Sequence, residues 1–321
     1  MTTLLLDRRG LTLKREGGTL ALFLDGERHG TVPLHLIERV VMRSSVRIDS
    51  GLLAHLADAG IGVLMFGGRR GRKQAVVLGR AHNDGARRIG QYRAYGDRLW
   101  RRQWAQRLVV HKLKGQMRLL RRALGDRPDL RNPLTTALGR LEQARHEIGA
   151  ETPPAVERLR GIEGAAAAAY FQGFTRLFPP SLEFTGRNRR PPRDPANAVL
   201  SLGYTLLHFE AVQAAYAAGL DPLIGFYHEL VFGRESLASD LIEPLRPKVD
   251  AWAWEQFRER RLRLDDFIHD GEACLLGKGG RKGFFGGFEL FVRPQRRWLR
   301  RIAGKLAGTL SAAGTKAEEM K

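Results

Sequence analysis

The chain has 321 residues, of which 43% are hydrophobic, and 54 Lys and Arg against 34 Asp and Glu give it a formal net charge of +20 at pH 7. This length fits two domains, and the hydrophobic content is high enough for them to fold without disulfide or metal cross-links. The single cysteine, Cys274, excludes an intramolecular disulfide. No stretch approaches the roughly 18 uninterrupted apolar residues of a membrane span, and Asp7 interrupts the first apolar run. We therefore expect a cytoplasmic protein with neither a membrane helix nor a signal peptide.

Residues 1–80 have the spacing of a β-rich domain. Short apolar runs are separated by turn residues, among them Gly10 and Gly17–Gly18, as in strands joined by tight turns. One helix is predicted in this region, with Ser50 as its N-cap and Gly60 as the glycine that ends it. We expect a compact β domain with one helix packed against it.

The pattern changes near residue 81. Residues 81–90 are polar and are interpreted as a linker, and beyond them apolar residues recur with the period of a helix. The predicted fold class is α+β: a small N-terminal β-rich domain (1–80) joined to a larger all-α C-terminal domain (91–312). We expect residues 313–321 to be a disordered tail. Helices are predicted over 91–124, 134–149, 153–178, 197–219, 236–268 and 287–312.

Basic residues are concentrated in three segments. Residues 87–131 hold fourteen Lys or Arg against three Asp, and further clusters lie at 186–194 and 278–301. Positive charge of this size attracts polyanions and favours a nucleic-acid-binding protein, although a basic face that is merely solvated is the alternative. Trp100 and Trp104 lie among the arginines of the first segment, where they either stack on exposed bases or belong to the core.

Several common nucleotide and metal motifs are absent from the sequence. There is no Walker A loop, no CxxC pair and no HExxH sequence. The glycine-rich segment 277–287 lacks the residue order of a phosphate-binding loop, so we interpret it as a basic loop rather than a nucleotide site.

Glu163 lies between two glycines in a segment with helical spacing. Glycine inside a helix costs about 1 kcal/mol relative to alanine, so Gly161 and Gly164 indicate the close approach of another backbone or of a ligand. The alanine run that follows is expected to be buried, and a carboxylate leading into a buried face needs a metal ion or another cation as its partner. The alternative is an ordinary solvated glutamate at a helix start.

His228, Asp240 and Glu243 are the other candidate site residues. His228 lies among apolar and aromatic residues, where a lone histidine is more often a core residue than a ligand. Asp240 and Glu243 are three residues apart, which places both on one side of a helical turn. Two such carboxylates repel each other unless a cation lies between them. The alternative is that the helix dipole, Arg246 and Lys248 neutralise them.

One histidine with two or three carboxylates is a chemically coherent set of metal ligands in so basic a chain. Oxygen donors with one imidazole suit Mn²⁺ or Mg²⁺ better than a structural Zn²⁺, which prefers thiolates or more histidines. Such an ion can stabilise the attacking and leaving oxygens of an in-line displacement at phosphorus. These residues therefore favour metal-dependent phosphodiester chemistry.

Four segments occur in the order and spacing of a known family. They are GIEG at 161–164, GRNRRPPRDPANAVLSLGYTLL at 186–207, DPLIGFYH at 221–228 and SLASDLIEPLRPKVD at 236–250. With them the chain resembles, over nearly its whole length, the CRISPR-associated integrases that cut and join DNA in spacer acquisition. The resemblance implies a metal-dependent DNA integrase and endonuclease. Such an enzyme inserts short foreign DNA segments as new spacers into a CRISPR array by 3′-hydroxyl attack on repeat DNA.

The resemblance also implies roles for the candidate residues. Glu163, His228 and Glu243 look like the ligands of a Mg²⁺ or Mn²⁺ ion, and Asp240 looks like the additional acidic catalytic residue beside them. Either Glu163 or Asp240 also helps to accept a proton. The family has Asp or Glu at the position of Glu243, so this glutamate is no departure. The DNA-binding candidates are Arg187, Arg189, Arg190, Arg246 and Lys248.

Partners follow from the same resemblance. It implies a homodimer formed through the β domains, with two dimers bridged by a small ferredoxin-like second adaptation protein of CRISPR systems. The DNA partners would be a short duplex with 3′-hydroxyl ends and CRISPR repeat DNA. Two other functions stay open: a repair nuclease for branched DNA, and a non-catalytic nucleic-acid-binding scaffold that keeps the fold without the metal.

Overall fold

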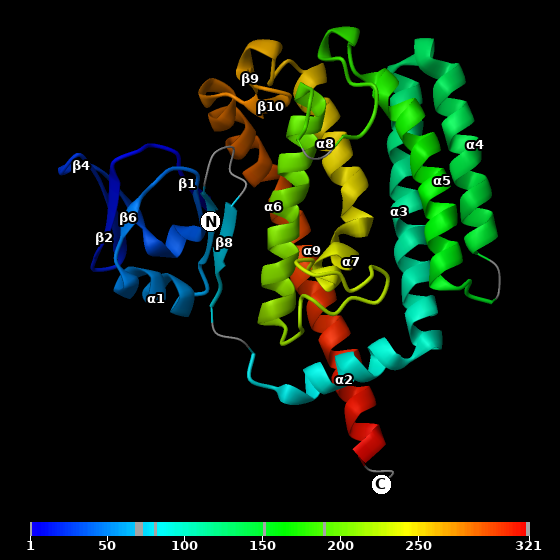
Figure 1. The fold of residues 1–321 in the computed structure, drawn as a ribbon, viewed down its shortest axis with the longest axis horizontal. Coiled ribbons are helices and arrows are strands. Elements are labelled where there is room, and N and C mark those ends of the chain that lie inside the picture. The colour runs from blue at the N-terminus through cyan, green and yellow to red at the C-terminus, as the bar shows by residue number, and fades with distance from the viewer. Residues whose placement is uncertain (1, 68–72, 80–81, 150–151, 189–190, 319–321) are drawn as a thin grey trace. The chain divides into compact units, whose positions relative to one another are not determined.

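The computed structural model describes residues 2–67, 73–79, 82–149, 152–188 and 191–318 (Figure 1). The chain divides into two compact units, Met1–Asn83 and Asp84–Lys321. The first unit is rich in β-strands and the second is mostly helical, which confirms the predicted α+β fold class. None of the described helices is both long enough and apolar enough to cross a membrane.

The described residues of the N-terminal unit form two four-stranded sheets, one α-helix and one 3₁₀ turn. Its elements are β1 (Thr2–Leu6), β2 (Leu11–Glu16), β3 (Thr19–Leu24), β4 (Glu27–Pro33), η1 (Leu34–Leu36), β5 (Ile37–Met42), β6 (Arg47–Ile48), α1 (Ser50–Asp58), β7 (Gly62–Gly67) and β8 (Lys73–Val77). One sheet has the order β1-β5-β7-β8, in which only the β7–β8 pair is antiparallel. The other has the order β4-β3-β2-β6 and is built on two antiparallel hairpins.

Apolar side chains of both sheets and of α1 share one core. Leu20, Val40 and Leu56 are fully buried in it. Tight turns fall at predicted glycines, since Gly10 has φ 81° and Gly17 has φ 58°. Glycine adopts this left-handed region without strain. The glycine spacing therefore placed the turns correctly.

Helix α1 is capped by a different residue from the one predicted. The N-cap is Asp49, whose Oδ1 accepts a hydrogen bond of 2.7 Å from the backbone N–H of Leu52, and Ser50 is the first helical residue. A carboxylate is a stronger acceptor than a hydroxyl for the N–H groups of a helix start. Gly60, with φ 70°, follows the helix end as predicted.

In its described residues, the second unit consists of helices and one short hairpin. Its helices are α2 (Gly85–Gly96), α3 (Arg98–Asp126), α4 (Arg131–Ile148), α5 (Val156–Phe174), α6 (Pro195–Ala217), α7 (Ser236–Ile242), α8 (Arg246–Arg258) and α9 (Lys278–Glu318). The antiparallel hairpin is formed by β9 (Phe267–Asp270) and β10 (Ala273–Leu276). Single 3₁₀ turns lie at η3 (Pro128–Leu130), η4 (Thr175–Leu177), η5 (Pro180–Leu182), η6 (Glu243–Leu245) and η7 (Leu264–Asp266).

Small residues let the helices of this unit approach one another closely. Helices α3, α4 and α5 pack together, and α6 packs against α7, α8 and α9 (Figure 1). A Cβ atom added to Gly115 of α3 would lie 3.0 Å from Cγ of Pro247, and one added to Gly203 of α6 would lie 3.0 Å from Cγ1 of Val249. Both contacts are with α8, so α3 and α6 converge on the helix that follows Glu243.

The helix predicted over 91–124 is in fact two helices, α2 and α3. Asp97 separates them with φ −81° and ψ 105°, and its carboxylate accepts hydrogen bonds from the backbone N–H groups of Leu99 and Trp100. An aspartate in this position caps the second helix. The chain therefore turns at Asp97 although the apolar spacing continues through it (Figure 1).

The helix predicted over 236–268 is also interrupted. Helix α7 ends at Ile242, the 3₁₀ turn η6 follows, and α8 ends at Arg258 before the hairpin begins at Phe267. Pro244 in η6 has no backbone N–H to continue the helical ladder. The prolines thus separate two short helices within the predicted helical segment 236–268.

The interpretation of 277–287 as a loop is wrong, because these residues form the start of α9 from Lys278 onward. Phe284 and Phe288 are buried at a spacing of four residues, so apolar packing outweighs the low helix propensity of the glycines. Helix α9 continues to Glu318, into the predicted disordered tail. At the other boundary, α2 begins at Gly85, inside the predicted linker.

Candidate active site

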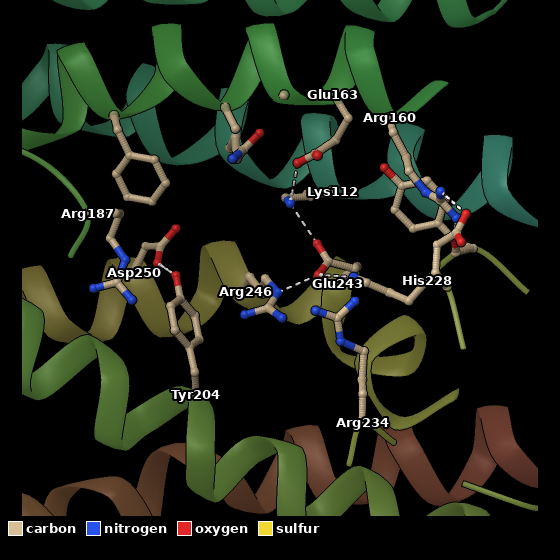
Figure 2. A pocket seen from close by; sticks show the side chains of 16 residues that line it. Lys112, Arg160, Glu163, Arg187, Tyr204, His228, Arg234, Glu243, Arg246 and Asp250 are labelled. Carbon is tan, nitrogen blue, oxygen red and sulfur yellow. Dashed lines mark hydrogen bonds and ion pairs between the residues drawn. The ribbon is translucent and has the colours of Figure 1, made fainter. Parts of the chain in front are cut away.

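The helical unit contains a pocket with a volume of about 460 Å³, shown in Figure 2. Basic side chains on its wall come from α3, α5, α8 and two loops, and acidic side chains from α5, η6, α8 and a loop alternate with them. The basic residues are Lys112, Arg160, Arg187, Arg234 and Arg246; the acidic ones are Glu163, Glu229, Glu243 and Asp250, with His228 beside them. The pocket therefore offers oxygen ligands for a cation and guanidinium groups for an anion.

Glu163 lies within α5, not at its start, and points into the pocket (Figure 2). A Cβ added to Gly161 or Gly164 would meet no atom within 4 Å, so no neighbouring backbone explains these two glycines. Gly164 itself lines the pocket. Of the two reasons predicted for the glycines, only room for a ligand is compatible with the structure.

Lys112 joins Glu163 to Glu243. Its Nζ lies 2.5 Å from Oε1 of Glu163 and 2.6 Å from Oε2 of Glu243, and the lysine side chain is only 12% exposed. Burial would lower the pKa of Lys112, but the charges of Glu243 and Glu163 outweigh this and raise it. Lys112 is therefore an ammonium ion held between two carboxylates (Figure 2).

Glu243 is almost completely buried and is paired on both oxygens. Arg246 Nε donates to its Oε1 at 2.5 Å. Its Oε2 lies close to Lys112 but accepts no hydrogen bond of good geometry, so that contact is electrostatic rather than a directed bond. Burial would raise the pKa of Glu243, but Arg246, Lys112 and His228 together hold it well below its usual value.

Asp240 lies behind His228 rather than in the pocket. Its Oδ2 accepts backbone N–H groups from Phe226 at 2.6 Å and Tyr227 at 3.0 Å. Its Oδ1 accepts the backbone N–H of His228 at 2.9 Å and lies 2.7 Å from the His228 ring atom Nδ1. Asp240 has no exposed surface. It does not share an open face with Glu243, as the three-residue spacing had suggested.

This arrangement fixes the imidazole of His228. A carboxylate can only accept, so Nδ1 carries a proton, and Nε2 is the ring atom left to face the pocket. Nε2 lies 3.6 Å from Oε1 of Glu243, on the pocket side. A histidine held in this way by a carboxylate has the second interaction that metal-binding histidines usually make.

The structure brings Glu163, His228 and Glu243 to one pocket from positions up to eighty residues apart in the sequence. Within the described part of the chain, however, no three His, Cys, Asp or Glu side chains are close enough together to hold an ion as they stand. The ammonium of Lys112 lies between the two glutamates. An ion could bind only if that ammonium moved.

The DNA-binding candidates have different positions. Arg187 lines the pocket, donates to Asn197 Oδ1, and lies over the Tyr204 ring. Arg246 also lines it, beside the same ring. Lys248 is exposed and does not line the pocket. Arg189 and Arg190 lie outside the described residues.

A second buried acid at the far end of the pocket was missed by sequence reasoning. Asp250 accepts a hydrogen bond of 2.9 Å from the hydroxyl of Tyr170 and another from the hydroxyl of Tyr204. Burial raises the pKa of Asp250 to about 6, and the two hydroxyl donors only partly offset that rise. Asp250 was visible in the motif at 236–250, but its spacing from Glu243 carried no signal of this pairing.

Lys112 was missed because it was counted with the basic face at 87–131. A signal was present, since Lys112 lies at helical spacing from the buried residues Val109 and Gln116. A lysine on the apolar stripe of a helix needs a buried partner. Trp100 and Trp104 stack on each other and meet Phe226 edge-on, and both are half-buried rather than fully in the core.

Known proteins similar to this chain share both its sequence and its fold. The family model of CRISPR associated protein Cas1 matches residues 4–289. A relative from Thermodesulfovibrio yellowstonii, named CRISPR-associated endonuclease Cas1 1, is 37% identical over 309 residues, which are 95% of this chain and 96% of the relative.

Solved structures with the same fold are more distant in sequence. A CAS1 protein from Thermotoga maritima has a TM-score of 0.82 at 24% identity, over 97% of each chain. A casposase bound to its integration product has a TM-score of 0.82 at 21% identity, over 98% of this chain and 91% of that one. A Cas6-RT-Cas1–Cas2 complex has a TM-score of 0.78 at 23% identity, over 98% of this chain and 35% of that one. These three likenesses concern the fold, whereas the family match and the T. yellowstonii relative extend over most of the sequence, and on those two findings the chain belongs to the CRISPR associated protein Cas1 family.

Proposed function

We propose that this protein is a DNA integrase and endonuclease that inserts short DNA segments as new spacers into a CRISPR array. Membership of the Cas1 family supports this, as does the endonuclease name of its T. yellowstonii relative. The observation that carries the proposal is the pocket in which Glu163, His228 and Glu243 meet among arginines. In the reaction, the oxygen of a 3′-hydroxyl bonds to a phosphorus of the repeat, and the bond from that phosphorus to its former 3′ oxygen breaks. With water as the attacker, the same displacement is hydrolysis.

We propose that Glu163, His228 and Glu243 hold a Mg²⁺ or Mn²⁺ ion. The donor set fits such an ion, because it consists of two carboxylates and one imidazole whose Nε2 faces the pocket. Oε2 of Glu243 is buried without a well-directed hydrogen bond, and both carboxylates already attract one cation, Lys112. When bound, the ion supplies charge stabilisation to the attacking and leaving oxygens.

The protein side chains then position the reactants. Asp240 orients His228 and is too fully engaged to take a proton from the attacking hydroxyl, so we assign that proton to Glu163. Arg234 lines the pocket, and its guanidinium makes no hydrogen bond or ion pair within the described residues, which leaves it able to bind a phosphate. Arg187 and Arg246 are the other guanidinium groups that we place near DNA.

Partners are proposed on the same basis. We propose that the substrate is a short duplex with 3′-hydroxyl ends, that the target is CRISPR repeat DNA, and that a small ferredoxin-like second adaptation protein completes the assembly. The charge of +20 supports the DNA partners. The likeness of this chain to a chain of the Cas6-RT-Cas1–Cas2 complex supports the protein partner. We further propose that residues 1–80 form the homodimer contact, with 91–312 as the catalytic domain.

The test compares wild type with Glu163→Ala in strand joining, using a 3′-hydroxyl duplex, the partner protein, Mn²⁺ and a repeat-bearing plasmid. Loss of a ligand from a site with few ligands should reduce joining by ~100-fold or more. Duplex affinity should be retained, because many other basic groups contribute to it. Glu157→Ala, an exposed glutamate on the same helix, is the matched control and should join normally.

Each of the other outcomes would indicate a different function or a different role for Glu163. Joining at the wild-type rate by Glu163→Ala would refute the assigned role of Glu163, and joining in excess chelator would refute the ion. A wild type that binds DNA without cutting or joining it would be the scaffold. A wild type that cuts branched DNA but never joins a repeat would be the repair nuclease.

A further inference from the structure

Glu163 and Glu243 each need a cation, and Lys112 supplies it to both. Within the described residues, Lys112 is the one ion-pair partner of Glu163. Glu243 has Arg246 on its other oxygen, but Oε2 has only the ammonium. Without a cation between them, the buried carboxylate of Glu243 and the partly buried carboxylate of Glu163 would repel each other. The ammonium therefore neutralises the two carboxylates, as a divalent ion would when bound.

Ammonium and ion cannot occupy the pocket in the same way. The two carboxylate oxygens lie 2.5 Å and 2.6 Å from Nζ. Mg²⁺ takes oxygen ligands at about 2.0–2.1 Å, so it would need the same oxygens at a closer distance. A second positive charge beside the ammonium would also be repelled by it. Binding of the ion thus requires Lys112 to leave both glutamates.

Gln116 offers the ammonium a second position. It lies one helical turn after Lys112 on the same face of α3, and both residues line the pocket. Gln116 is 2% exposed, and its buried Oε1 has no hydrogen-bond partner among the residues that the structure describes. A buried amide oxygen without a partner is costly, and a lysine ammonium is a suitable donor for it.

We propose that Lys112 is an internal counter-cation that competes with the divalent ion for Glu163 and Glu243 and moves to Oε1 of Gln116 when the ion binds. The inference rests on the proposed ion site and adds a determinant of its affinity. Lys112 is thus a positioning residue with two resting places. It holds the two glutamates in place before the ion binds. It also lowers the affinity for the ion, because free energy is needed to displace the ammonium.

The first experiment measures ion affinity without activity. The full chain is melted in chelator and in a Mn²⁺ titration, for wild type, Lys112→Met and the control Lys114→Met, an exposed lysine on the same helix. Lys112→Met should melt lower in chelator, because its glutamates repel each other, and should be stabilised at a lower Mn²⁺ concentration. We expect an affinity gain of roughly 5- to 150-fold, the usual range for coupled sites. Lys114→Met should behave as wild type.

The second experiment tests the new position of the ammonium. Gln116→Leu should weaken Mn²⁺ binding in the Lys112 protein, because the displaced ammonium loses its acceptor. It should have no such effect in the Lys112→Met background, where there is no ammonium to receive. A non-additive cycle of this kind isolates the interaction between the two residues. Equal weakening in both backgrounds would instead make Gln116 a ligand in its own right and would overturn the second position.

The outcomes separate this inference from the function on which it rests. If wild type and Lys112→Met respond to the same Mn²⁺ concentration, the ion site stands and the competition is refuted. If neither responds, the ion site fails and the inference with it. If Lys112→Met does not fold, Lys112→Gln provides the same comparison, since its neutral amide can still donate to both glutamates.

Discussion

Glu243 and Asp250 are two buried carboxylates that line one pocket. Their pKa values differ because their partners differ, although both are buried. Glu243 is surrounded by Lys112, Arg246 and His228, and its pKa is held well below the usual value. Asp250 is buried just as completely but accepts hydroxyl groups from Tyr170 and Tyr204, and its pKa is raised to about 6. Desolvation opposes the charged form in both cases. Only the cations around Glu243 reverse its effect.

The difference assigns different tasks to the two ends. The Glu243 end carries fixed negative charge at neutral pH, which a metal ion requires. The Asp250 end is a hydrogen-bonded network that joins α5, α6 and α8 through one side chain from each. We therefore interpret Asp250 as a support for Tyr204, whose ring lies beside Arg187 and Arg246, rather than as a further ligand.

The largest effect is expected when the ion-paired end is broken. Glu243→Gln leaves the partly buried Arg246 without its carboxylate, and removing one partner of a largely buried pair commonly costs ~3–5 kcal/mol of unfolding free energy. Denaturant unfolding in chelator measures this loss. Glu255→Gln is the control, because its pair with Arg122 is partly exposed and should contribute at most ~1 kcal/mol. Equal losses in the two variants would contradict the view that the Glu243 cluster is a buried ionic unit.

A pH series sharpens the contrast at the other end. Asp250 has a folded pKa of about 6 against an ordinary value of 3.8, so the folded state takes up this proton first as the pH falls. Its ionised form therefore destabilises the protein above pH 6, and stability should be regained by up to about 3 kcal/mol between pH 6 and pH 4. Asp250→Asn should lack this gain.

The comparison is made by subtracting the unfolding free energy of Asp250→Asn from that of wild type at each pH. Carboxylates elsewhere in the protein cancel in this difference. Tyr204→Phe serves as a second variant, because loss of one donor should raise the pKa of Asp250 further and move the gain to higher pH. A difference that does not change between pH 6 and pH 4 would mean that the pKa of Asp250 is not raised in the folded protein.

The smallest effect is expected from replacing Arg234, whose guanidinium has no carboxylate partner among the described residues. Arg234→Ala should leave the melting temperature unchanged, because the side chain is exposed and makes no ion pair within the described residues. If it binds one phosphate, duplex affinity should fall and the log–log salt slope should decrease by about 0.9. Arg140→Ala, which changes an exposed arginine of α4 outside the pocket and outside the three basic segments, is the control. An unchanged slope for Arg234→Ala would remove it from the DNA-binding surface.

Much of the fold could be predicted because strand turns and helix periods are local. Glycine spacing placed the turns at Gly10 and Gly17, and apolar spacing placed most helices. The errors fall where one side chain overrides the pattern. Asp97 caps a new helix inside a continuous apolar stripe, and buried phenylalanines make a helix of the glycine-rich segment 277–287.

The candidate site was predicted only as far as its motifs reach. The motif segments contain Glu163, His228 and Glu243, which meet in the pocket, but nothing in their spacing shows that Asp240 would face away from it. Lys112 could not be assigned, because its two partners lie 51 and 131 positions further along the chain. A long-range pairing leaves no local pattern in the sequence. The charge of Lys112 was therefore interpreted as part of the basic face at 87–131.

The hydrogen bonds of Asp240 also bear on the order in which the site assembles. They reach only 12 to 14 residues back along the chain, whereas the bond from Lys112 to Glu163 spans 51. Closing a short loop costs less entropy than closing a long one, so the histidine end can form while the rest of the helical unit is still unfolded. The two glutamates meet only when α5 and η6 have both docked against Lys112 of α3. A newly made chain would thus hold an oriented histidine for some time before it could hold an ion, and its capacity to cut DNA would arise with the last long-range contact rather than gradually.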